Sequence, residues 1–381
     1  MHRTSLLLPL LFACHTAGKD APADDSGATD SGDADSGDSA DSGDSADTAD
    51  TGDSGGETAA CLAAAAMVDA ADALITAFST DQAAAALFTL DAPERKEWSN
   101  LPVPMEPRTG LPFSEMTEAQ VAAVHTLLQA SLSDAGYTTV NAVFHAEDWA
   151  YANGDPVLGS HYFHVAFFGT PSTAGAWGWQ LDGHHLVLNF TLVGCDATFV
   201  PAFYGASPVV LPSGDYAGEE ALAARTAAGF ALLGSFDEAQ RATANLTGRY
   251  GPMMQAGPED EDNLPATPEG MCGADLPEPQ RALLLATLET WVLDQEDALA
   301  VRWMDLLREE LDDTCVGYVE DTESPDAVYY RIHGPSVWIE FDHINGPDHI
   351  HGVLRDPLDD YGEDLLARHY ARHTHGRAPA R

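Results

Sequence analysis

Apolar residues recur at helical spacing in the first third of the chain beyond residue 58. Two alanine-rich stretches, 60–78 and 81–90, predict helices. Thr117-Glu118-Ala119-Gln120 forms a capping box, and the residues after it place apolar side chains on one helical face. That face carries Val121, Val124, Leu127, Leu128 and Leu132. Gly136 is expected to end this helix.

The middle and the end of the chain show the alternation typical of strands. Strands are expected over 161–168, 184–193, 327–332, 336–341 and 349–354, and His333-Gly334-Pro335 indicates a hairpin. Two further helices are expected to begin near Glu219 and Pro277. Helices gathered early and strands later predict an α+β fold, with helices packed on a mainly antiparallel sheet in a single globular domain. The proline-rich stretch 251–270 is interpreted as a surface loop.

The first residues resemble the leader of a bacterial lipoprotein. Met1-His2-Arg3 precedes a short apolar run that ends in Leu11-Phe12-Ala13-Cys14. This pattern predicts a signal peptide over 1–13 and a lipid on Cys14, although an ordinary secretory signal can also contain a cysteine. We therefore expect an exported protein, anchored by Cys14 in the cell envelope and most simply in the outer membrane.

Residues 14–57 are expected to form a disordered acidic linker, and residues 58–381 the globular domain. From residue 20 to 57 the chain is built almost entirely from Asp, Ser, Gly, Ala and Thr, without aromatic or branched aliphatic side chains that could form a core. A calcium-binding repeat is the alternative for such an Asp-rich segment. No large apolar residue recurs at a fixed period, which favours a spacer.

The remaining chain is also strongly acidic. The formal net charge is −44, and residues 58–381 still hold 48 of the 61 acidic and 15 of the 17 basic residues. Because phosphate backbones and anionic lipids repel such a surface, nucleic acid is not an expected partner. The expected membrane partner is reached through Cys14 alone.

Four cysteines follow Cys14, namely Cys61, Cys195, Cys272 and Cys315. An even number in an oxidising compartment predicts two disulfides, with three possible pairings. The cysteines form no C-x-x-C pair, so they do not indicate a zinc ribbon.

Histidines gather where strands are expected to begin. His349 and His351 lie two apart on one strand and therefore share a face, which allows both to reach one ion. His185 has the parity of Asn189 and is the better ligand of its pair, whereas His184 has the parity of core residues and is expected to be buried. Neutral imidazoles suit Zn²⁺ first, and Cu²⁺ or Fe²⁺ as well. Histidines that only cap strands are the plainer interpretation.

Three residues are candidates for catalysis. Glu340 lies on the strand before His349 and can bind metal, orient a ligand or act as a general base, although an exposed glutamate is an equal alternative. Arg355 can clamp a carboxylate or phosphate of a substrate, with Asp360 holding its guanidinium. A structural Arg–Asp pair at a turn explains the same residues.

Several of these segments occur together in an order that resembles the domain of unknown function 3500 family. They are Phe168-Gly169-Thr170-Pro171, Trp177-Gly178-Trp179, Gly183-His184-His185-Leu186, Tyr330-Arg331-Ile332, Ile339-Glu340-Phe341 and His349-Ile350-His351 with Arg355-Asp356-Pro357. The resemblance covers roughly 60–375. It implies a single domain that contains both histidine segments, and it implies no settled activity.

Two functions therefore stay open. The first is a metal-dependent hydrolase of a small molecule or peptide, in which histidines hold the ion and metal-activated water attacks the substrate. The second is a protein that binds metal or a small ligand without turnover. The same ligands also suit a copper or iron oxidoreductase.

Overall fold

The computed structural model describes residues 54–248, 254–258, 264–320, 328–344 and 346–372. The expected signal peptide, Cys14 and nearly all of the expected linker lie outside the described residues. The first described element, helix α1 (Ser54–Thr76), begins four residues before the expected start of the globular domain. The described residues belong to one compact unit.

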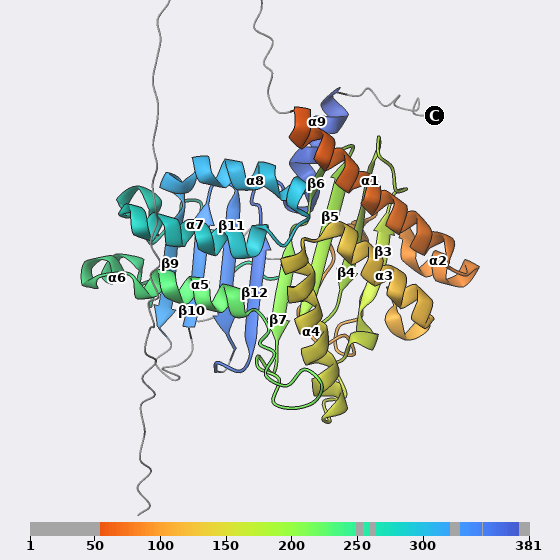
Figure 1. Cartoon of the computed structure of the whole chain (residues 1–381), viewed down its shortest axis with the longest axis horizontal. Coiled ribbons are helices and arrows are strands. Elements are labelled where there is room, and N and C mark those ends of the chain that lie inside the picture. Colours follow the sequence, from red (N-terminus) through yellow and green to blue (C-terminus); the bar gives the residue numbers. More distant parts are fainter. Residues whose placement is uncertain (1–53, 249–253, 259–263, 321–327, 345, 373–381) are drawn as a thin grey trace, which may run out of the picture. The chain divides into compact units, whose positions relative to one another are not determined.

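One sheet of twelve strands organises the described part of the chain (Figure 1). Its main path runs β1-β3-β4-β5-β7-β12-β11-β10-β9-β8, and β2 and β6 pair with β3 and β5. All pairs are antiparallel except β1 with β3. The strands are β1 (Leu87–Phe88), β2 (Leu111–Pro112), β3 (His164–Phe168), β4 (Ala176–Asp182), β5 (Leu186–Val193), β6 (Asp196–Thr198), β7 (Ala202–Ala206), β8 (Met271–Cys272), β9 (Cys315–Glu320), β10 (Val328–Gly334), β11 (Val337–His343) and β12 (Ile350–Arg355).

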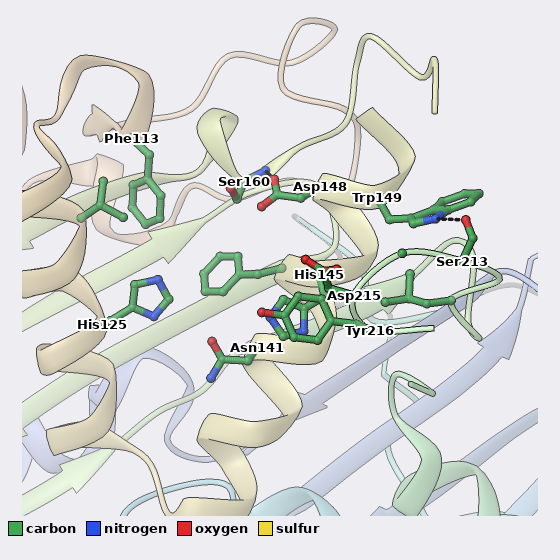
Figure 2. A pocket seen from close by; sticks show the side chains of 14 residues that line it. Phe113, His125, Asn141, His145, Asp148, Trp149, Ser160, Ser213, Asp215 and Tyr216 are labelled. Carbon is green, nitrogen blue, oxygen red and sulfur yellow. Dashed lines mark hydrogen bonds between the residues drawn. The ribbon is translucent and has the colours of Figure 1, made fainter. Parts of the chain in front are cut away.

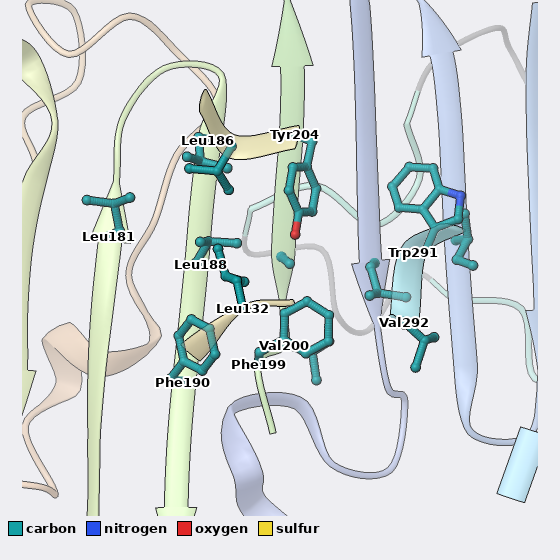
Figure 3. Close-up of a cluster of buried hydrophobic side chains, with 14 of the residues drawn as sticks. Leu132, Leu181, Leu186, Leu188, Phe190, Phe199, Val200, Tyr204, Trp291 and Val292 are labelled. Atoms are coloured by element: carbon teal, nitrogen blue, oxygen red, sulfur yellow. The ribbon is translucent and has the colours of Figure 1, made fainter. Parts of the chain in front are cut away.

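Helices cover one face of this sheet, which confirms the expected α+β class (Figure 1). Besides α1 they are α2 (Thr80–Ala86), α3 (Glu118–Ser131), α4 (Asp134–Ala152), α5 (Ala223–Gly234), α6 (Glu238–Ala244), α7 (Glu278–Val292) and α8 (Asp297–Glu309); a last helix, α9 (Glu363–Arg372), follows β12. The expected capping box at Thr117 starts α3, with Gln120 completing it. The apolar faces of α1 to α8 pack on the sheet in one core, where Leu132 and Trp291 from the helical side lie with Leu188 and Tyr204 of the strands (Figure 3).

The prediction that Gly136 ends a helix is wrong. Helix α3 ends at Ser131, and Gly136 lies in the first turn of α4, whose N-cap is Ser133. A Cβ on Gly136 would lie 2.2 Å from the carbonyl oxygen of Asp294, so the residue is glycine because another backbone passes against it. A glycine that is required by close packing looks the same in the sequence as a glycine that ends a helix.

The sheet and its helices consist of two similar halves. In the first half, α1, α2, β2, α3, α4 and the strands β3–β5 follow one another; in the second, α5, α6, β8, α7, α8 and β9–β11 repeat that order. The last strands of the halves, β7 and β12, pair antiparallel at the centre of the sheet. The two halves therefore form one continuous sheet, related by an approximate two-fold axis (Figure 1).

Individual interactions repeat in the two halves as well. Gln82 of a capping box at α2 donates to Gln120 of α3, and Gln240 of a capping box at α6 donates to Gln280 of α7. The turns between the paired helices meet at the axis, where Leu132 bridges to Gln295. Such matched details indicate a duplicated unit.

The other face of the sheet is covered by coil segments. Trp98 from the first half and Ala256 from the second pack on it with Phe203, Trp338 and Val353. The expectation that 251–270 is a surface loop is wrong for its described part around Ala256, which is fully buried. The polar side chains of this face are consequently enclosed.

All four cysteines form disulfides, which confirms the expected two bonds and decides their pairing. Cys61 of α1 is bonded to Cys195 beside β6, and Cys272 of β8 is bonded to Cys315 of β9. The segment Thr58–Thr76 of α1 is long and apolar enough to cross a membrane by length and composition. It packs against α3 and α8 through one face, on which Met67, Ala71 and Leu74 are fully buried.

Candidate metal centre

His184 and His185 form the turn of the hairpin between β4 and β5. Gly183 N–H donates to the Leu186 carbonyl at 2.9 Å and closes this two-residue turn. Strand β5 begins at Leu186, two residues later than expected. The rule that neighbouring side chains point to opposite faces applies inside a strand, so it does not separate these two rings, whose centroids lie 3.9 Å apart.

His349 and His351 lie at the start of β12, in the centre of the sheet. His351 is opposite Gly205 of β7 in the register, and Gly205 N–H donates to the His185 carbonyl at 2.6 Å. A Cβ on Gly205 would lie 2.6 Å from Cδ2 of His185 and 3.1 Å from Cδ2 of His351. Glycine at this position therefore leaves the space in which imidazoles from the two halves approach each other.

The four histidines converge, as expected for His185, His349 and His351. Nε2 of His349 lies 3.2 Å from Nε2 of His185 and 3.0 Å from Nε2 of His351. One ligand atom from each of these three and from His184 lies within 4.8 Å of the others. A metal bound tetrahedrally at about 2.0–2.1 Å separates its nitrogen ligands by about 3.3–3.4 Å. The group is therefore compact enough to hold one ion.

Burial keeps these imidazoles neutral. It lowers the pKa of His184 to about 3 and lowers the pKa of His185, His349 and His351 as well. The neighbouring rings lower the pKa of His351 further, because two cationic imidazoles repel each other. Neutral imidazole is the form that binds transition metals. Nδ1 of His184 is buried without a hydrogen-bond partner among the described residues.

Glu147 of α4 orients His185. Its Oε1 lies 2.6 Å from Nδ1 of His185, and its Oε2 accepts the Gly159 N–H at 2.9 Å. A carboxylate at Nδ1 fixes the proton there and leaves the Nε2 lone pair facing the other rings. Burial raises the pKa of Glu147 to about 7, against the influence of the Gly159 N–H and of His184. A nearby cation would favour the carboxylate form.

Arg108 fixes a coil segment beside the histidine turn. Its Nε donates to Asp182 at 2.6 Å, and its NH2 group donates to the carbonyls of Ser99 and Leu101. Asp182 is the last residue of β4, and the same NH2 group also donates to the Gly183 carbonyl, directly before His184, at 3.3 Å. The segment around Leu101 is thereby held against one side of the histidine group.

Glu340, Arg355 and Asp360 lie in a polar network of the second half. Glu340 accepts the N–H groups of Gln255 and Ala256 and the hydroxyl of Tyr329. Arg355 donates to the carbonyls of Ala256 and Gly257 and to Asp360. These bonds anchor the segment 254–257 on the sheet. The catalytic roles expected for the three residues stay predictions.

The second half contains a counterpart of the histidine turn without histidines. Pro335 and Ser336 form the two-residue turn between β10 and β11, where Gly334 pairs with Val337. Glu310, the C-cap residue of α8, lies thirteen residues after the first residue of its helix, as Glu147 does in α4, and accepts the N–H and hydroxyl of Ser336. The glutamate and the turn are thus common to both halves, whereas only the turn of the first half carries histidines.

Sequence reasoning missed Glu147, Gly205 and Arg108. The pattern of α4 contains a signal for the first, because Val140, Val143 and Glu147 follow one another at helical spacing on its buried face. A carboxylate on an apolar stripe indicates a buried polar partner. Gly205 and Arg108 act through contacts with distant segments, which the sequence does not indicate.

Fold and site together define a class of protein: a duplicated α+β sheet with a buried four-histidine group, able to hold a metal ion, where the halves meet. The chain belongs to the family described as protein of unknown function (DUF3500), which it matches over residues 62–363. This confirms the resemblance noted in the sequence. No curated protein and no solved structure matches the chain.

Proposed function

We propose that the histidine group binds a divalent transition-metal ion, most readily Zn²⁺, and that the protein is a metal-dependent hydrolase of a small molecule or peptide. The observation that carries the proposal is the convergence of three Nε2 atoms. That of His349 lies 3.2 Å from His185, which is 164 residues away in the sequence, and 3.0 Å from His351. Neutral nitrogens at such distances repel through their lone pairs unless a proton or a cation lies between them. A shared cation satisfies all of them.

The donor set favours a borderline metal. Imidazoles without thiolates or clustered carboxylates suit Zn²⁺, Cu²⁺ and Fe²⁺ better than Mg²⁺ or Ca²⁺. Glu147 on Nδ1 of His185 is the outer partner that histidine ligands of metals ordinarily have. It is also the only carboxylate with a hydrogen bond to one of the four rings among the interactions described.

Hydrolysis is supported if the three close nitrogens of His185, His349 and His351 hold the ion and His184 lies beside them. A three-histidine site leaves a coordination position for water or substrate. When bound, such an ion polarises a carbonyl or phosphoryl oxygen and lowers the pKa of coordinated water from about 15.7 to about 7. His349, the least buried of the four rings, marks the side from which substrate approaches.

Metal capture without turnover is the second candidate. It is favoured by the presence of a fourth imidazole, because four protein ligands around a tetrahedral ion leave no open position. A copper or iron oxidoreductase would use the same residues.

Metal analysis of the purified protein tests the proposal. We expect about one transition-metal ion per chain in the wild type and none in His349→Ala with His351→Ala. His333→Ala is the matched control, because it removes a buried histidine of β10 from outside the group and should keep the metal. A folded double variant that retains its metal would contradict the assignment.

Hydrolysis and capture are separated by turnover and by ligand exchange. Ester, phosphoester and peptide substrates should be cleaved by the zinc-loaded protein and spared by the double variant. In Co²⁺-substituted protein, added azide or cyanide should change the visible spectrum if a coordination position is open. Bound metal with neither turnover nor a spectral change would support capture.

We also propose export and lipid anchoring at Cys14, with the membrane as a partner through that lipid alone and no nucleic-acid partner. The two disulfides support an oxidising compartment. Labelling with a palmitate analogue should mark the wild-type chain and spare Cys14→Ser. Equal labelling of both would contradict the anchor.

A further inference from the structure

A cavity of about 450 Å³ lies on the helical side of the protein, between α3, α4 and the segment 211–216 (Figure 2). Its volume suits a small organic ligand. Helix α4 contributes neighbouring residues to two different sites, since Glu147 contacts His185 whereas Asp148 lines this cavity. None of the four histidines of the candidate metal centre lines it.

Aromatic rings form much of the cavity wall. His145 and Tyr216 stack with centroids 3.5 Å apart and planes inclined by 12°, and Trp149 is held by a bond from its indole N–H to Ser213 (Figure 2). Phe113 and Phe144 line the end that lies toward α3. Ring faces of this kind attract organic cations through their negative quadrupole.

The polar groups of the cavity are mainly acceptors. Nδ1 of His145 lies 2.7 Å from Glu219 Oε2, which leaves Nε2 as the nitrogen of this ring that a ligand can engage. Asn141 uses its NH₂ group on the Tyr137 carbonyl, which leaves its carbonyl oxygen for a ligand. Asp148 accepts the Ser160 N–H with one oxygen and has a second oxygen to offer.

Asp215 adds a second carboxylate. It is exposed at the cavity rim, and it has no hydrogen bond or ion pair among those described. The residues that line the cavity include neither Lys nor Arg. A permanent positive charge must therefore come from the ligand.

We propose that this cavity is a binding site for a small organic cation, an ammonium or guanidinium compound that donates to the acceptors and lies against the rings of Trp149 and Tyr216. The site is independent of the metal proposal, because it shares no side chain with the histidine group. An anion is disfavoured by Asp148 and Asp215. A neutral ligand would leave both carboxylates without a counter-charge.

Three probes of one shape and different charge test the proposal by isothermal titration. Benzylammonium should bind the full-length protein about tenfold more tightly than benzyl alcohol, since a cation–π contact and a carboxylate together contribute about 1.4 kcal/mol. Benzoate should show no binding. Equal affinity for the alcohol, tighter binding of benzoate, or no heat from benzylammonium would overturn the proposal.

Variants locate the bound cation. Asp215→Asn should weaken benzylammonium binding about fivefold, and Tyr216→Leu about threefold through loss of the ring face. Asp297→Asn, an exposed charge on α8, is the control and should leave the affinity unchanged. Unchanged binding in both cavity variants, or an equal loss in the control, would place the cation elsewhere. Thermal unfolding of each variant checks that its fold is intact.

Discussion

Glu147 and His185 form a buried pair whose function is testable with a single atom change. Glu147→Gln keeps the shape of the side chain but replaces the anionic partner of Nδ1. Because such outer partners raise the basicity of a histidine ligand and fix its tautomer, we expect metal affinity to fall 10- to 100-fold, roughly, with the fold retained. Competition with a chromophoric chelator measures the change.

The matched control for that variant is Glu310→Gln. Glu310 is the C-cap residue of α8 and holds the turn of the second half through Ser336, and no histidine of the group contacts it among the bonds described. Metal affinity should be unchanged. Equal losses in the two variants would show that the glutamates act through fold stability alone.

Gly205 is the residue whose absent side chain shapes the centre. In Gly205→Ala the new Cβ would meet Cδ2 of His185 at 2.6 Å and the Ile350 carbonyl oxygen at 2.9 Å. At least one strand or ring must move, so we expect destabilisation of about 1–3 kcal/mol together with weaker metal binding. Urea unfolding with metal titration measures both.

Gly234→Ala at the end of α5 is the comparison, because a Cβ there meets no atom within 4 Å. It should leave metal binding unchanged and unfold at the same or a slightly higher urea concentration. If Gly205→Ala also leaves metal binding and stability unchanged, the close approach of His185 and His351 does not depend on a glycine at position 205.

At the scale of elements, the residues of the two equivalent hairpin turns can be exchanged to test which of them bind metal. His184 and His185 occupy the same positions between β4 and β5 as Pro335 and Ser336 do between β10 and β11. Replacing His184-His185 by Pro-Ser should keep the hairpin, because its register is set by long paired strands. Metal binding should be lost, since only His349 and His351 remain.

The reciprocal exchange, Pro335→His with Ser336→His, should create no second metal site. The strand that would supply the other ligands is β7, which carries no histidine. Circular dichroism and metal content distinguish the outcomes. Two ions per chain in the reciprocal variant, or full metal retention in the first, would contradict this account of the centre.

At the scale of the whole molecule, a bound ion would connect the two halves. His184 and His185 come from the first half, His349 and His351 from the second, and they meet beside the β7–β12 pairing. An ion that binds only the folded protein stabilises it by about 2.7 kcal/mol when its free concentration is about 100 times Kd. We therefore expect a chelator to lower the unfolding temperature by several degrees.

The double variant His349→Ala with His351→Ala provides the control for this effect. It should unfold at a temperature that neither zinc nor chelator changes. A chelator effect of equal size in the variant would mean that the stabilising ion binds outside the histidine group.

The sequence by itself determined the local features of this protein. The capping box at Thr117, the approximate strands, the two disulfides and the common face of His349 and His351 all depend on short-range spacing, which a chain carries wherever it folds. The α+β class followed from the order of these elements. The observed bounds of these elements differ from the expected ones by a few residues. Because β5 begins only at Leu186, His184 and His185 lie in a turn, where the alternation of strand faces does not apply.

Only the tertiary structure decided which residues meet. His185 reaches His349 across 164 residues, Glu147 approaches from a helix that the sequence analysis did not predict, and Gly205 leaves the space between the rings. The duplication became visible through matched contacts, because the two halves keep their pairing geometry while their side chains differ. Long-range contacts depend on strand order and helix packing, which are settled by burial over the whole chain and not by any one segment.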